Sequence, residues 1–105
     1  MSSSDVKATK ALTATGQLQG FIGTGAGTAT NLGPIRIQSV QAQASAADGS
    51  IKIYDGTSAS GTLVYEANCG TEGIDVYVPG SGIRCRTGVY LDLTNTTSVT
   101  IGYTG

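Results

Sequence analysis

The stretch that decides the fold is IKIYDGTSASGTLVYEANCGTEGIDVYVPGSGIRCRTGVYLDLTNTTSVTIGY, residues 51–103. It contains six short segments in which apolar and polar residues alternate, and turn-forming residues separate them. Successive side chains of a β-strand point to opposite sides of the sheet, so this alternation predicts half-buried strands. The six segments are IKIY, TLVYEA, IDVYV, GIRCR, VYLDLT and SVTIGY.

Most of these segments divide into an inner and an outer face. We expect the inner face to hold the aliphatic residues and one cysteine: Ile51, Ile53, Ile74, Val76, Val78, Ile83, Cys85, Val89, Leu91 and Leu93, with Val99, Ile101 and Tyr103 in the last strand. In TLVYEA both faces carry apolar residues. Leu63, Tyr65 and Ala67 share one face, and Val64 and Glu66 share the other. The sequence does not decide which of these two faces is buried.

A strand is also predicted after Pro34, which is tolerated where a strand begins. Its apolar positions move from Ile35 and Ile37 to Val40, Ala42 and Ala44, and this change of phase predicts a bulge near residues 38–39. The end of the segment, QAQASAA, also has helical propensity. We prefer a strand because Asp48-Gly49 is typical of a hairpin turn into the next strand.

The first third of the chain gives weaker signals. Residues 1–7 are polar and predict a flexible arm, residues 8–19 predict a strand, a turn near Gly16 and a weak second strand, and GTGAGTATNLG at 23–33 predicts a long loop. No helix start follows these glycines, so they do not form a phosphate loop. The whole pattern, about eight short strands, predicts a single antiparallel β-sandwich over residues 8–105, jelly-roll-like in arrangement.

Size and charge narrow the class of protein. A chain of 105 residues is long enough for one domain. Its net charge of −1 gives no electrostatic attraction to phosphates, so we expect no nucleic-acid partner. No apolar run approaches the roughly 18–20 residues that span a bilayer, and the N-terminus lacks a signal core, so we expect no membrane partner.

The residue types argue against an enzyme. The sequence has no histidine, which removes the usual base for nucleophilic catalysis. The seven acidic residues are scattered; Asp48 and Asp55 fall in predicted turns, where aspartate accepts backbone hydrogen bonds, while Asp75 and Asp92 fall on outward positions. We therefore predict no catalytic residue and no cofactor.

Metal binding and modification are equally poorly supported. Cys69 and Cys85 cannot complete a usual zinc site without histidine, and no loop has the dense acids of a calcium site. The two cysteines are either buried thiols, the reading that we prefer, or a disulfide. Asn95-Thr96-Thr97 matches the glycosylation pattern, but we interpret it as turn chemistry.

The outward strand positions supply the candidate site. They combine tyrosine with basic residues, and tyrosine and arginine are enriched in protein–protein interfaces. An ordinary exposed sheet face remains the alternative, because tyrosine and arginine also pair across strands. The predicted contact surface consists of Lys52, Tyr54, Tyr77, Arg84, Arg86 and Tyr90.

The chain as a whole resembles a group of small proteins, about a hundred residues long, encoded by tailed phages that include marine and cyanobacterial ones. The resemblance covers nearly the whole sequence, beginning with KATKALTATGQLQG at 7–20 and GSIKIYDGTSASGTLVYEA at 49–67. It is most specific in VPGSGIR at 78–84 and VYLDLTNTTSVTIGY at 89–103.

This resemblance implies a non-enzymatic virion component, made in the host cytoplasm, such as a capsid decoration protein, a head fibre or knob, or a tail accessory. Its expected partners are other virion proteins and further copies of itself. The alternative is a carbohydrate- or receptor-binding sandwich, although the sequence has no tryptophan for a sugar platform.

Overall fold

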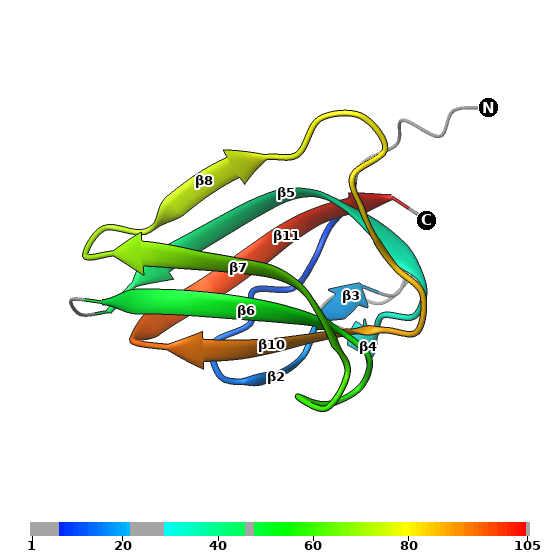
Figure 1. Ribbon diagram of the computed structural model, residues 1–105, viewed down its shortest axis with the longest axis horizontal. Coiled ribbons are helices and arrows are strands. Elements are labelled where there is room, and N and C mark those ends of the chain that lie inside the picture. Colours follow the sequence, from blue (N-terminus) through cyan, green and yellow to red (C-terminus); the bar gives the residue numbers. More distant parts are fainter. Residues whose placement is uncertain (1–6, 22–28, 46–47, 105) are drawn as a thin grey trace.

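Two antiparallel sheets form the body of the protein in the computed structural model, which describes residues 7–21, 29–45 and 48–104 (Figure 1). These residues contain no helix, and the predicted all-β sandwich is confirmed. The jelly-roll arrangement stays a prediction. We name each sheet after its central strand, the β5 sheet and the β6 sheet.

The β5 sheet follows the order β1-β11-β5-β8, and β9 also pairs with β5, beyond the end of β8. The β6 sheet follows the order β2-β10-β6-β7, and a small third sheet pairs β3 with β4. The strands are β1 (Lys7–Ala8), β2 (Gly16–Gln17), β3 (Gln19–Phe21), β4 (Ala29–Asn31), β5 (Ile35–Ala44), β6 (Gly49–Asp55), β7 (Thr62–Gly70), β8 (Ile74–Tyr77), β9 (Ile83–Cys85), β10 (Val89–Thr94) and β11 (Thr96–Thr104).

The core lies between the two sheets and is built from the alternating aliphatic positions. Burying these side chains removes apolar surface from water, which is the main term that stabilises a small sandwich. The fully buried aliphatic side chains come from both sheets and from the link between β2 and β3: Leu18, Ile37, Val40, Ile51, Ile53, Val89, Leu91, Val99 and Ile101.

The bulge predicted in β5 is confirmed. Gly102 of β11 lies opposite Ser39, whereas the next residue, Tyr103, lies opposite Ile37, so Gln38 is the extra residue. On the other side of β5, the Val78 N–H donates to the Gln38 carbonyl at 2.8 Å. The strand continues through Ala44, so the helical alternative for its end is wrong.

The hairpin predicted at Asp48-Gly49 is wrong, because β5 and β6 belong to different sheets. The chain turns a corner of the sandwich there, and β10 passes into β11 at a second corner, at Asn95. The Ser45 N–H donates to the Asn95 carbonyl at 2.8 Å, which joins the two corners. A Cβ at Gly49 would lie 2.9 Å from that same carbonyl oxygen, so the tight corner requires glycine.

A second bulge settles the open question in β7. Tyr65 lies opposite Ile53, while Leu63 lies opposite Tyr54, so Val64 is the extra residue. Directly opposite residues share a face, so Tyr65 points inward and Leu63 points outward. The sequence pattern had placed both on one face because a bulge reverses the alternation.

The start of the chain departs most from expectation. Residues 1–6 of the predicted arm lie outside the described residues, and Lys7 pairs with Tyr103 in β1. The turn predicted near Gly16 is confirmed as a bend at residues 14–15, and Gly16 itself begins β2, where it pairs with Leu91. The predicted loop at 23–33 is wrong for Ala29–Asn31, which pairs with β3, and residues 22–28 lie outside the described residues.

Candidate interaction surfaces

Five of the six residues of the predicted contact surface lie on two separate faces of the sandwich, and the sixth, Arg86, follows β9. Lys52 and Tyr54 on β6, with Tyr90 on β10, share the outer face of the β6 sheet. Tyr77 and Arg84 lie on β8 and β9, on the outer face of the β5 sheet. Alternation along one strand shows that a residue points outward. The pairing of the strands decides to which of the two sheets that strand, and so the residue, belongs.

Two tyrosines form the centre of the β6-sheet surface. Tyr54 and Tyr90 lie directly opposite each other, with ring centroids 6.4 Å apart and planes tilted by 58°. This is a favourable aromatic geometry. The same row of the sheet continues to Gln17 on β2 and to Leu63 on β7, whose side chain is 46% exposed.

A charged row runs beside the tyrosine row. Lys52 lies opposite Asp92 on one neighbouring strand and opposite Glu66 on the other. Opposite charges across strands attract each other, so the charge of Lys52 is matched within the same chain. With one lysine and two carboxylates, this row carries a net charge of −1.

A chain of amide side chains lies beside the end of the tyrosine row. Asn31 donates from Nδ2 to Oε1 of Gln17 at 2.9 Å, and Gln19 donates from Nε2 to Oδ1 of Asn31 at 3.2 Å. The Asn31–Gln17 bond links the small β3–β4 sheet to the β6 sheet, while the Gln19–Asn31 bond lies within the small sheet. They also fix exposed polar groups next to an aromatic pair.

The β5-sheet surface holds two arginines that the sheet places face to face. Arg36 on β5 lies directly opposite Arg84 on β9. Sequence reasoning missed Arg36, although its place between Ile35 and Ile37 marks it as outward-facing. Tyr77 lies opposite Ser39 on the same sheet and is 73% exposed, the most exposed large hydrophobic side chain of the described residues.

Arg86 follows β9, where a carboxylate holds the crossover to β10. Asp55 accepts the backbone N–H groups of Arg86 at 2.9 Å and Thr87 at 2.8 Å, and that of Gly88 at 3.5 Å. The bonds from Arg86 and Thr87 are the main reason why the pKa of Asp55 is lowered. The predicted role of Asp55 in backbone hydrogen bonding is confirmed, although its partners lie more than 30 residues away.

Both cysteines are buried free thiols, as preferred from the sequence. Cys85 lies opposite Ile35, at the start of β5, while the pairing of Gly70 with Gly49 places Cys69 near the end of β5. That strand is ten residues long, roughly 30 Å, and a disulfide needs Cα atoms within about 7 Å. Burial raises the pKa of Cys69, and it raises that of Cys85 to about 11.

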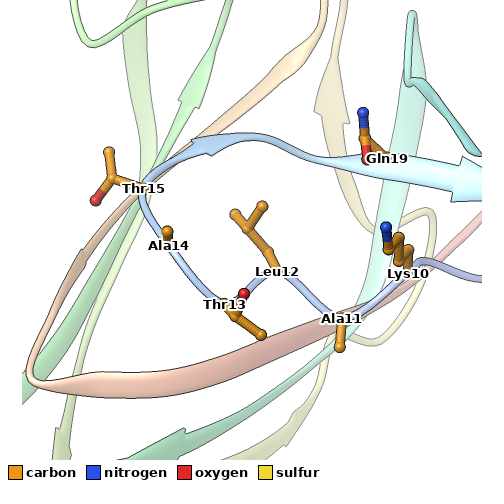
Figure 2. Close-up of a pocket in the computed structure, with 7 residues that line it drawn as sticks. All are labelled: Lys10, Ala11, Leu12, Thr13, Ala14, Thr15 and Gln19. Atoms are coloured by element: carbon orange, nitrogen blue, oxygen red, sulfur yellow. The ribbon is translucent and has the colours of Figure 1, made fainter.

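Residues 10–15, which close one side of the sandwich, line a cavity of about 250 Å³ together with Gln19 (Figure 2). The segment is tied to both sheets: Leu12 exchanges backbone hydrogen bonds with Val99, and the Leu93 N–H donates to the Thr15 hydroxyl at 3.0 Å. Lysine is the one titratable type in its lining, so the cavity offers no acid–base pair. Its lining residues are Lys10, Ala11, Leu12, Thr13, Ala14, Thr15 and Gln19.

Within the described ranges, no three cysteine or acidic side chains gather in a group that could hold a metal ion. The same ranges contain no helix of the length and apolar character needed to cross a membrane.

No family model, no curated protein and no solved structure matches the chain.

Proposed function

We propose that this chain is a non-enzymatic structural protein of a phage particle, such as a capsid decoration protein, a head fibre or knob, or a tail accessory, and that it acts through protein–protein contacts. The exposed Tyr77 on the arginine-bearing face of the β5 sheet carries the proposal. Tyrosine and arginine are the side chains that most often dominate protein–protein binding energy. The resemblance of the sequence to small phage proteins is the reason for proposing that these contacts are made within a phage particle.

The edges of the two sheets support the same function. In the described part of the chain, β7 pairs only with β6, and β8 pairs only with β5. Each of these edge strands carries unpaired backbone groups, which can add a strand from another chain. Leu63 and Tyr77, the two exposed large hydrophobic side chains of the described residues, lie on these strands.

Mass spectrometry of purified particles tests the proposal directly. We expect the chain in intact virions of the phage that encodes it, at a constant ratio to the capsid protein. Tyr77→Ser should reduce incorporation, while Thr13→Ser, on the closed side of the sandwich, should not. Absence of the chain from purified particles would overturn the proposal.

A carbohydrate- or receptor-binding module is the second candidate, and the β6-sheet surface favours it. The Tyr54–Tyr90 pair offers an aromatic surface, and the Gln17 and Asn31 amides lie beside it. Sugars bind to such combinations of aromatic faces and amide groups. A glycan array should then show hits that Tyr90→Ala removes, and an array without hits would eliminate this function.

A further inference from the structure

The arginines of this protein gather at one end of the molecule. Arg36 and Arg84 face each other across β5 and β9, and Arg86 lies two residues further along the chain. This is the right-hand end of the long axis in Figure 1, where β5 begins and the orange segment leads towards β10. Like charges directly opposite each other on a sheet are destabilising, so the pair costs stability in an isolated chain.

The opposite end carries exposed acidic residues. Asp48 lies in the corner between β5 and β6, and Glu72 lies in the turn between β7 and β8. The pairing of Gly49 with Gly70 brings these two segments together, and Figure 1 shows the start of β6 and the end of β7 at the left-hand end. Asp75 follows on β8, opposite Gln41.

The carboxylates between the two ends have partners inside the chain. Lys52 lies between Asp92 and Glu66, and Asp55 is bound to backbone N–H groups near Arg86. Among the described residues, the three arginines thus lie at one end, and Asp48, Glu72 and Asp75 lie towards the other. Arg36 and Gln43, which lies near the acidic turn, are separated by seven residues of strand, roughly 23 Å.

That separation is well beyond the screening length of about 8 Å at physiological salt. The two ends therefore do not neutralise each other within one copy, and each is available to a different neighbour. We propose that the basic end of one copy binds the acidic end of the next, so that Asp48 and Glu72 supply the carboxylates that Arg36 and Arg84 lack. Arginine pairs with carboxylates in bidentate geometry, which gives such a contact direction as well as charge.

A contact between two different surfaces of the same chain is head-to-tail. Such contacts close into a ring or continue as a filament, according to the rotation between successive copies. Exposed ion pairs are individually weak, so the contact in solution depends strongly on salt. This inference rests on the proposed structural role. It identifies the partner that binds to the arginine-bearing end of the β5 sheet as a second copy of the chain.

Sedimentation of the purified chain over a concentration series tests this. We expect association at about 0.01 M salt, where the screening length is about 30 Å, and a loss of association at about 0.15 M and above. Arg84→Glu should weaken it by about tenfold or more, and its new carboxylate faces Arg36, so the fold tolerates the change. Lys10→Glu changes the charge equally on the closed side and serves as the matched control.

Mixing two reversed variants makes the test specific. Arg84→Glu alone and Glu72→Lys alone should each associate poorly, while an equimolar mixture should associate again, because each variant keeps one native end. A chain that stays monomeric at low salt, a control that fails as badly as Arg84→Glu, or a mixture without recovery would overturn the inference. A monomeric chain that is still found in virions would overturn the inference alone and leave the proposed function standing.

Discussion

Removing the carboxylate of Asp55 should destabilise the protein, since this group fixes the crossover from one sheet to the other. The carboxylate accepts two good backbone hydrogen bonds, from Arg86 at 2.9 Å and Thr87 at 2.8 Å, and a weak one from Gly88 at 3.5 Å. Hydrogen bonds to a charged acceptor contribute about 1.5–3 kcal/mol each when shielded, and about 1 kcal/mol each when partly exposed, as here. We expect Asp55→Ala to lower the free energy of unfolding by about 2 kcal/mol.

Thermal and urea unfolding measure this loss. For a chain of this size, 2 kcal/mol corresponds to a fall in Tm of about 10 °C. Asp55→Asn keeps one acceptor oxygen without the charge, so we expect about half the loss. Asp75→Ala removes an exposed carboxylate on β8 and should stay within about 0.5 kcal/mol of the wild type.

The dependence on pH checks the cause. The pKa of Asp55 is lower in the folded chain than its usual value of 3.8, so its contribution is fully present above about pH 4. This contribution is lost as the pH falls through the folded-state pKa. The difference in the free energy of unfolding between wild type and Asp55→Asn should therefore shrink in that range of pH. Two results would refute the reasoning: a loss of unfolding free energy below 0.5 kcal/mol for Asp55→Ala, or a difference between wild type and Asp55→Asn that does not change in acid.

Three further predictions concern the core, a turn and the thiols. Ile53→Ala should cost about 3 kcal/mol in urea unfolding, because a fully buried side chain leaves a cavity; a cost below 1 kcal/mol would contradict this packing. Gly82→Ala should lower the free energy of unfolding by about 2 kcal/mol, since φ is +78° there and the added Cβ would lie 2.3 Å from the Ile37 carbonyl oxygen. An unchanged Tm would show that the two atoms do not come this close. Cys69 and Cys85 should react with a thiol reagent at pH 8 only after unfolding, and rapid labelling of the native chain would argue against their burial.

The sequence determined the kind of fold because alternation is a local property. The inward aliphatic positions from Ile51 to Ile101 are read from neighbouring residues alone, and the bulge at Gln38 follows from a change of phase within one strand. The turn chemistry of Asp48 and Asn95 is also local, and both residues adopt positive φ. That these turns are corners between sheets, rather than hairpins, depends on strands far away in the chain.

The candidate site depended on tertiary structure for the same reason. An outward residue is recognised from its own strand, but its neighbours are set by register with other strands. Tyr54 and Tyr90 come together, and Arg36 meets Arg84, only because β6 pairs with β10 and β5 with β9. The sequence by itself thus determined an all-β chain rich in outward tyrosine and arginine, and tertiary pairing decided which of these side chains act together and at which end of the molecule they lie.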